Sequence, residues 1–174
     1  MKTILITGAT SGIGLAAARK LSNSKNNLIL CGRRQYKLDE ISNELSKITN
    51  VLPLSFDVSN KNEVNRLLNG LPEQFSAIDI LINNAGNAHG LDTIQDGSLD
   101  DWDNMINSNV KGLLYVSRVI MPKMIEQQSG HIINIGSLAG REVYEKGNIY
   151  CATKHAVNAI SKAMRIDLNK TGIK

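Results

Sequence analysis

The sequence predicts an α/β protein with a doubly wound parallel sheet, the Rossmann fold. Short runs that are apolar throughout alternate with longer segments of helical period, and strands buried on both faces of a parallel sheet have that composition. Right-handed crossover connections then place helices on both faces of the sheet. The expected strands are residues 2–7, 27–31, 51–56, 78–82 and 131–136.

The segments between and after these strands carry a helical pattern. Apolar residues recur at spacings of three and four, which predicts one buried face of each helix. Ser98 can cap the helix that follows it, and a last helix follows Tyr150. The residues that carry the pattern are Leu38, Ile41, Leu45 and Ile48, then Val64, Leu67 and Leu68, then Trp102, Met105 and Ile106, and finally Val157, Ile160, Met164 and Leu168.

The chain has the length of one domain and carries five strands, whereas a doubly wound dinucleotide-binding sheet usually has roughly six. We therefore expect residues 1–174 to form a single domain whose sheet is incomplete at its C-terminal end. The strand at 131–136 is then expected to be an edge without its neighbour, with unpaired backbone groups.

Cysteine and histidine usage argues against a disulfide framework and against a metal site. Cys31 and Cys151 are far apart and form no CxxC pair, which favours a reducing, cytoplasmic location. His89, His131 and His155 show no ligand spacing, so we expect no metal.

Charge and hydropathy argue against nucleic-acid and membrane partners. The formal net charge is +4, but the basic residues are dispersed and aromatic residues are only 4% of the chain. Nucleic-acid surfaces usually combine a basic stripe with stacking aromatics. No apolar run approaches the ~20 residues that span a bilayer, and the first strand begins too early for a signal peptide.

A glycine-rich turn follows the first strand and precedes a helix. Glycine in this setting permits a tight turn, close approach of the backbone to a pyrophosphate, and close packing of helix on strand. The helix N-terminus adds unpaired N–H groups that favour an anion. The alternative is a tight turn without a ligand. The residues expected to contact the cofactor here are Gly8, Thr10, Ser11, Gly12, Ile13 and Gly14.

Two arginines at the end of the second strand indicate NADP rather than NAD. NAD sites usually carry an acidic residue here for the ribose 2′-hydroxyl, but this chain has Gly32, Arg33 and Arg34. A guanidinium suits the 2′-phosphate of NADP, and no carboxylate at this strand end repels it. The alternative is two solvated arginines opening a helix, the end of the helix dipole that disfavours cations.

Further polar residues follow the later strands and helices: Asn83-Asn84-Ala85-Gly86, Asn109, Ser137, and Tyr150 with Lys154. Residues four apart share a helix face. An ordinary tyrosine has a pKa near ~10, and a neighbouring ammonium favours the phenolate. Tyr150 can then exchange a proton while Ser137 hydrogen-bonds the reacting oxygen and a nicotinamide supplies hydride. Each residue alone also has a structural explanation, but their coincidence in this order favours catalysis.

This set of motifs resembles the short-chain dehydrogenase/reductase family over the whole chain. The resemblance implies that Tyr150 is the general acid/base and that Ser137 orients the substrate oxygen. It implies that Lys154 binds the nicotinamide ribose and favours the tyrosinate, and that Asn109 holds a water of a proton relay. The further cofactor contacts that it implies are Asp57, Val58, Asn84, Ala85 and Gly86.

Within the family, three stretches resemble NADP-dependent 3-hydroxy acid dehydrogenases that also oxidise serine and allo-threonine: 32–35, 78–90 and 131–137. The resemblance also implies a homo-oligomer, dimer or tetramer, formed through helices near 102–127 and 150–170, and a C-terminal substrate lid beyond residue 174.

The expected function is therefore an NADP(H)-dependent oxidoreductase that interconverts a small alcohol and its carbonyl. The alternative is a catalytically inactive NADP-binding regulatory or scaffolding protein of the same fold.

Overall fold

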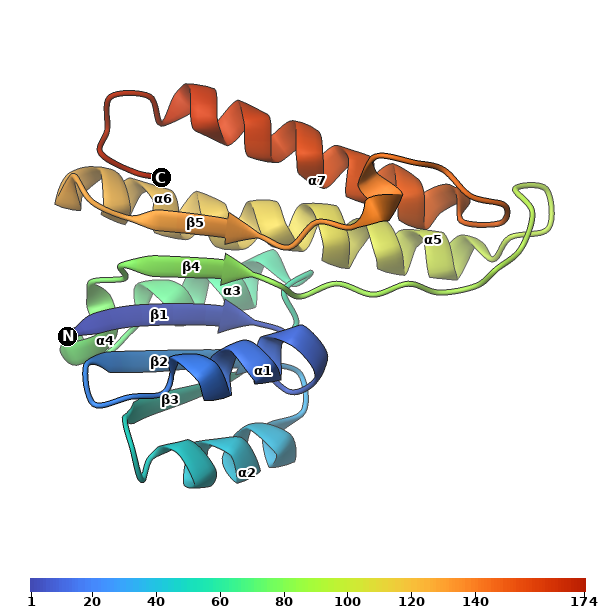
Figure 1. Ribbon diagram of the computed structural model, residues 1–174. Helices are drawn as coiled ribbons and strands as arrows, with labels where there is room; N and C mark the ends of the chain where they lie inside the picture. Colours follow the sequence, from blue (N-terminus) through green and yellow to red (C-terminus); the bar gives the residue numbers. More distant parts are fainter.

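A computed structural model describes all residues, 1–174, and confirms the doubly wound parallel sheet (Figure 1). Five strands lie in the order β3-β2-β1-β4-β5, and every neighbouring pair is parallel. All five strands therefore end at the same edge of the sheet. Their bounds are β1 Lys2–Thr7, β2 Asn26–Gly32, β3 Asn50–Ser55, β4 Ile80–Asn83 and β5 His131–Asn134.

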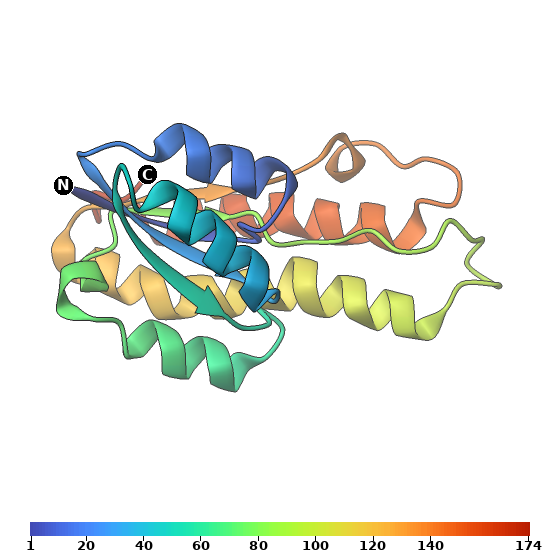
Figure 2. The same ribbon diagram turned by 90° about the horizontal axis from the view of Figure 1, so that it is seen from below.

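Helices cover both faces of this sheet. Helices α1 and α2 lie on one face, α3 and α6 lie on the other, and α7 lies along α6 beyond the β5 edge (Figures 1 and 2). The helix bounds are α1 Gly12–Leu21, α2 Gln35–Leu45, α3 Lys61–Asn69, α4 Glu73–Ser76, α5 Leu99–Ile106, the π-helix η1 Asn107–Gly112, α6 Leu113–Gln127, the 3-10 turn η2 Leu138–Gly140 and α7 Asn148–Asp167.

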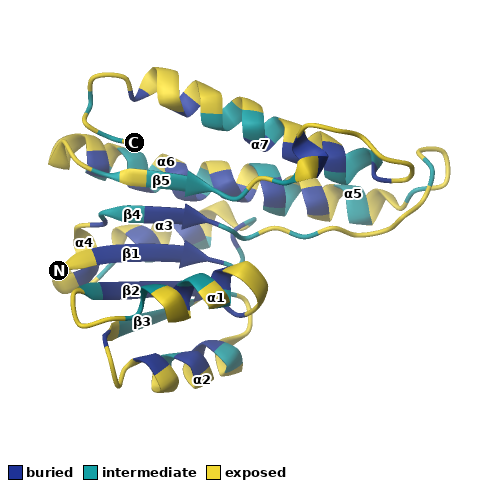
Figure 3. Cartoon of the chain, viewed as in Figure 1, coloured by how far each residue is buried: buried dark blue, intermediate teal, exposed yellow.

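The apolar strand runs are explained by burial on both faces. In β1, Ile4 and Ile6 pack with the α1 and α2 side of the core, whereas Leu5 packs with α3 and α6. Alternate residues of β2 divide in the same way. The central strands are accordingly buried along most of their length (Figure 3).

Several boundaries differ from the sequence prediction. The fourth strand occupies 80–83 rather than 78–82, and the fifth ends at 134 rather than 136. Helix α2 ends at Leu45, so Ile48 is exposed rather than on a buried helix face. Helix α7 begins at Asn148, two residues before Tyr150. Ser98 caps α5 as predicted, since its hydroxyl accepts the Asp101 N–H.

The prediction of an unpartnered strand at 131–136 is wrong at the start of that strand. The N–H of Ile132 donates to the carbonyl of Lys174 at 2.8 Å, and the N–H of Lys174 donates to Gly130 at 3.0 Å. Ile173 forms a parallel bridge with Gly130. The last residues of the chain therefore satisfy backbone groups beside β5.

A buried polar chain ties β4 and β5 to the two longest helices. The Asn83 amide donates to Ser117 on α6 at 3.0 Å and to the Asn134 carbonyl oxygen on β5 at 2.9 Å. The Asn134 amide in turn donates to Ser161 on α7 at 2.9 Å. These bonds fix both helices against the sheet next to the edge where the strands end.

Two further observations concern the chain as a whole. No helix combines the length and the apolar character needed to cross a membrane. No group of three metal-ligating side chains comes together in the structure.

Candidate active site

A cleft of about 570 Å³ lies at the edge where the strands end. Segments that follow all five strands contribute to its lining, together with the first two turns of α7. Of the predicted cofactor contacts, only Gly14 is absent from the lining; those present are Gly8, Thr10, Ser11, Gly12, Ile13, Arg33, Arg34, Asp57, Val58, Asn84, Ala85, Gly86, Tyr150 and Lys154.

Two of the three glycines in the loop, Gly8 and Gly14, are packed too tightly for a side chain. Gly8 has a φ of +66°, and a Cβ there would lie 2.9 Å from the Cα of Ala85. A Cβ on Gly14 would lie 2.4 Å from the carbonyl oxygen of Gly8. Gly14 therefore lets the first turn of helix α1 pack closely on the loop at Gly8. Close helix packing is the role predicted for one glycine of such a turn.

Thr7 and Asn84 hold the loop in place, and the importance of Thr7 was not predicted. The Thr7 hydroxyl oxygen accepts the N–H groups of Asn84 and Ala85, each at 3.0 Å. The Asn84 side-chain amide donates to the carbonyls of Thr7 at 2.9 Å and Gly8 at 3.2 Å. Asn84 thus supports the loop that lines the cleft, besides lining it.

Arg33 and Arg34 have different surroundings. Arg34 donates to the Thr10 hydroxyl at 2.8 Å and to the Ser11 hydroxyl at 3.2 Å. Arg33 is exposed and lies 3.5 Å from an Asp57 carboxylate oxygen. Arg34 is therefore fixed on the glycine loop, whereas Arg33 is held by one long, exposed ion pair.

Although β2 ends without an acidic residue, the cleft does contain a carboxylate. Asp57, which follows β3, is among its lining residues. Burial alone raises the pKa of Asp57, but hydrogen bonds from Ser59 and the charge of Arg33 outweigh it and hold that pKa below its ordinary value. Asp57 is therefore an anion beside Arg33 and attracts that guanidinium.

The cleft has the features that a dinucleotide requires. The first N–H groups of α1 receive no bond from the side chain of Ser11, the residue that precedes the helix, and a helix N-terminus favours an anion. Beyond Gly12 the space is open, since a Cβ there would meet nothing within 4 Å. Two guanidinium groups lie beside this opening. The residues present thus suit a pyrophosphate with an additional phosphate at one end.

Tyr150 and Lys154 lie one turn apart on α7 at the other end of the cleft. The Lys154 ammonium lies 5.9 Å from the centroid of the Tyr150 ring and donates to the Ile135 carbonyl at 3.0 Å. Lys154 is buried, and this burial lowers its pKa. Gly86 packs closely on Asn109 beside this ammonium, because a Cβ on the glycine would lie 3.1 Å from the Asn109 side-chain oxygen.

Asn109 lies in the π-helical turn, behind the cleft rather than on its surface. Its amide donates to the Asn87 carbonyl at 2.8 Å and to the Thr153 hydroxyl at 3.1 Å, and its oxygen accepts the Asn87 N–H at 2.8 Å. A π turn displaces backbone groups from regular helical pairing and is frequent at functional sites. Asn109 therefore links the segment after β4, through Asn87, to α7, through Thr153.

Ser137 lies just beyond Gly136, which lines the cleft, but the serine itself lines neither this cleft nor the next. Its hydroxyl oxygen accepts the N–H of Ala139 at 3.2 Å, which caps the short η2 turn.

A second cleft of about 470 Å³ shares Tyr150 and Ala88 with the first. Its walls come from the segment after β4 and from the turn that precedes α7, and it was not predicted. Its remaining lining residues are His89, Gly90, Leu91, Met105, Tyr144, Lys146, Gly147 and Asn148.

Comparison with known protein families decides how this arrangement is classified. Residues 2–174 match the short chain dehydrogenase family. The chain belongs to that family. This membership agrees with the doubly wound parallel sheet.

Relatives in this short chain dehydrogenase family include two that cover almost the whole chain. The NADP-dependent 3-hydroxy acid dehydrogenase YdfG of Escherichia coli K12 is 42% identical over 171 residues, which are 98% of this chain and 68% of that protein. An uncharacterised oxidoreductase of Staphylococcus aureus USA300 is 42% identical over 173 residues, 99% of this chain and 74% of that protein.

Two solved structures are also similar to the chain over almost its whole length. A closed form of serine dehydrogenase complexed with NADP⁺ is similar with a TM-score of 0.95 and 41% identity, covering 99% of this chain and 68% of that one. Serine dehydrogenase from Escherichia coli is similar with a TM-score of 0.94 and 42% identity, covering 98% and 78%.

Proposed function

We propose that this short-chain dehydrogenase is an NADP(H)-dependent oxidoreductase that interconverts a small alcohol and its carbonyl. The observation that carries the proposal is the position of Tyr150, which lines both clefts. A proton-transfer group must reach the substrate oxygen while the cofactor lies next to the same carbon. The position of Tyr150 on both clefts supports its assignment as this proton-transfer group.

The first cleft is the proposed NADP(H) site. The glycine loop and the α1 N-terminus would hold the pyrophosphate, and Arg33 would hold the 2′-phosphate. Asp57 and Val58 would contact the adenosine end, and Tyr150 and Lys154 the nicotinamide ribose. When bound, the cofactor supplies or accepts the hydride. One similar protein is named an NADP-dependent dehydrogenase, and a similar solved structure is a complex with NADP⁺. Both support this choice of cofactor.

The residues of the chain supply the proton. Tyr150 donates it to the substrate oxygen in reduction and removes it in oxidation. The charge of Lys154 favours the phenolate in either direction. Ser137 would hydrogen-bond the substrate oxygen, which requires its hydroxyl to turn from the Ala139 N–H toward the cleft. Asn109 would position the relay by holding the segment after β4.

A small 3-hydroxy acid or hydroxy amino acid is the proposed substrate. The second cleft has the volume of a small-molecule site, and proteins named for 3-hydroxy acid and serine oxidation are about equally similar to the chain. We also propose that 1–174 is one domain, since a single five-stranded sheet carries a buried apolar cluster on each of its faces.

Replacing Tyr150→Phe tests the proposed function. Loss of the hydroxyl removes the acid/base, so NADPH consumption with a small carbonyl should fall by roughly 10²-fold or more. NADPH affinity, measured by fluorescence titration, should change little because most of the cofactor cleft is untouched. Tyr36→Phe, at an exposed tyrosine on α2, is the matched control.

Retention of turnover in Tyr150→Phe would remove the tyrosine from its proposed role. NADPH binding without turnover in the unsubstituted chain would instead favour the alternative of a non-catalytic NADP-binding protein.

We further propose that the protein is a cytoplasmic homo-oligomer, a dimer or a tetramer. Its two cysteine thiols are free and buried, which suits a reducing compartment. Apolar side chains are exposed on α5, α6 and α7, namely Ile106, Leu114, Ile125 and Ile166. Sedimentation velocity should detect a dimer or tetramer, and a monomer at all concentrations would contradict the assembly.

A further inference from the structure

One wall of the second cleft is a tight turn that ends where α7 begins. The N–H of Gly147 donates to the carbonyl of Tyr144 at 3.0 Å, which closes the four-residue turn 144–147. Lys146 occupies the third position of the turn with a φ of +63°. Glycine or asparagine is the ordinary residue at such a position, because a left-handed backbone strains a longer L side chain.

The strain at Lys146 has no explanation in helix termination. The other two non-glycine residues with positive φ are Gln128 and Lys170. They follow the C-terminal ends of α6 and α7, where a left-handed residue commonly completes the last turn. Lys146 instead precedes a helix. Lys146 is strained and lines a cleft, which makes it a candidate for a binding role.

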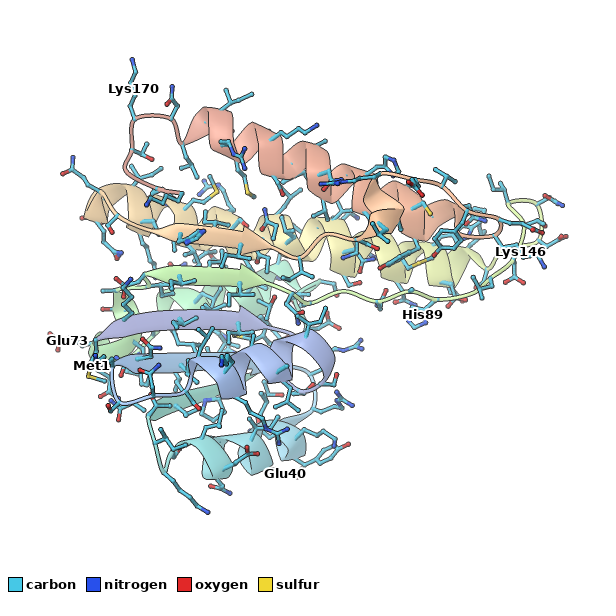
Figure 4. The ribbon with its side chains drawn as sticks, viewed as in Figure 1. Met1, Glu40, Glu73, His89, Lys146 and Lys170 are labelled. Atoms are coloured by element: carbon cyan, nitrogen blue, oxygen red, sulfur yellow. The ribbon has the colours of Figure 1, made fainter.

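The charge of the second cleft is of one sign. Its ionisable lining residues are Lys146, His89, Tyr144 and Tyr150, and no carboxylate is among the lining residues. The carboxylates of Asp92 and Asp101 lie next to the lining residue Gly90, since their oxygens would be 3.3 and 3.5 Å from a Cβ on that glycine. His89 and Lys146 come from two separate segments at the same end of the molecule, the end opposite Lys170 (Figure 4).

The Tyr144 hydroxyl is a second donor in this cleft. Partial burial, together with the influence of Cys151 and Tyr150, raises the pKa of Tyr144 above its ordinary value. The phenol therefore keeps its proton and can donate a hydrogen bond. The ring of Tyr144 packs on Gly147, where a Cβ would lie 2.4 Å from a ring carbon.

We propose that Lys146 binds the carboxylate of a small hydroxy acid in the second cleft and so directs the hydroxyl-bearing carbon to Tyr150. The inference rests on the proposed function and assigns the residue that selects an anionic substrate over a neutral one. A charge-assisted contact between an ammonium and a carboxylate supplies that selection. Lys146 acts on substrate binding, while the proton transfer stays with Tyr150.

Lys146→Gly tests this assignment without disturbing the fold, because glycine suits the left-handed backbone at that position. The probes are 3-hydroxypropanoate and its methyl ester, each offered with NADP⁺ to the 174-residue chain. For the acid, kcat/KM should fall about 10- to 100-fold, the range typical of a lost charge-assisted hydrogen bond. For the neutral ester it should change less than about threefold, since the ester offers no charge to the ammonium.

Lys170→Gly is the matched control, because it removes a lysine of the same backbone conformation at the far end of the molecule. It should leave both probes unaffected. Lys146→Arg should retain the preference for the acid. Equal losses for acid and ester in Lys146→Gly, or no loss for either, would overturn the assignment.

A binding measurement separates this inference from the proposed function. Calorimetry on NADP⁺-loaded Tyr150→Phe protein should show that 3-hydroxypropanoate binds, and that adding Lys146→Gly weakens the binding by the same 10- to 100-fold. Unchanged affinity, or no binding before the lysine is removed, would overturn the role of Lys146. The role of Tyr150 is decided separately, by turnover of NADPH.

Discussion

At the scale of single residues, the two arginines after β2 have different partners in the first cleft. Sequence alone predicts a pair that reads the 2′-phosphate. In the structure Arg34 bonds Thr10 and Ser11 of the glycine loop, whereas Arg33 remains exposed beside Asp57. A guanidinium that already has two hydroxyl partners is a support for the loop, so Arg33 is the freer ligand for a phosphate.

We therefore predict different effects of removing each arginine. Arg33→Ala should weaken NADPH binding about 10- to 100-fold and leave NADH binding nearly unchanged, because only NADPH carries the 2′-phosphate. Arg34→Ala should weaken both cofactors, because it loosens the loop that both require. Fluorescence titration with each cofactor measures these affinities.

Arg19→Ala is the control, since Arg19 is also exposed and also paired with a single carboxylate, that of Glu44. Equal losses for NADPH and NADH in Arg33→Ala would contradict the assignment of the 2′-phosphate.

Residue identities could be predicted from the sequence better than residue contacts. Tyr150, Lys154 and Gly8 were predicted as site residues from their spacing and neighbours, and all three line the first cleft. The hydrogen bonds of Asn84 to Thr7 and Gly8 join segments more than seventy residues apart. Neither segment has a sequence pattern that predicts its contact with the other. The placement of Ser137 outside both clefts likewise depends on how the turn after β5 folds.

At the scale of elements, the polar chain through Asn83 explains how α6 and α7 are held at the site. Asn83 and Asn134 are opposite each other in the register of β4 and β5, so their side chains share one face of the sheet. That face is covered by the helices that carry Ser117 and Ser161. The chain of four side chains thus fixes α7, and with it Tyr150, relative to the strand ends.

Removing one member of this chain should destabilise the protein. Asn83→Ala removes the donor to the Ser117 hydroxyl oxygen and to the side-chain oxygen of Asn134, and the loss of these two buried bonds costs about 1–3 kcal/mol in the free energy of unfolding. Urea unfolding followed by circular dichroism measures it. Asn65→Ala, which removes an exposed asparagine bonded to Asn69, should cost much less. A loss in Asn83→Ala no greater than in this control would show that the buried chain contributes little.

The elements themselves were largely predictable because burial imposes a pattern on composition. Strands with both faces covered are apolar throughout, and each of the five was recognised for that reason. The π turn at Asn107–Gly112 was not predicted. One extra residue in a helical turn leaves the apolar spacing on either side almost unchanged, so periodicity does not reveal it.

At the scale of the whole molecule, the proposed function depends on two clefts that share Tyr150 and Ala88. Segments that follow all five strands line the first cleft. Because the strands are parallel, their carboxyl ends lie at one edge of the sheet, and the sequence predicts this topology. The second is bounded by residues 88–91 and by the turn 144–147. These segments lack any periodic pattern, and their proximity follows from the packing of α5 and α7 on each other and from the hydrogen bond that the Asn148 amide donates to the Asp92 carbonyl at 2.8 Å.

The central claim is that both clefts act together in one hydride and proton transfer at Tyr150. The most direct test supplies the chain with NADPH deuterated at the nicotinamide C4 position and a small 3-oxo acid, and analyses the product by mass spectrometry. We predict deuterium on the former carbonyl carbon of the hydroxy acid, and none when Tyr150→Phe is used. Bound NADPH with no deuterium in any alcohol product would contradict the claim.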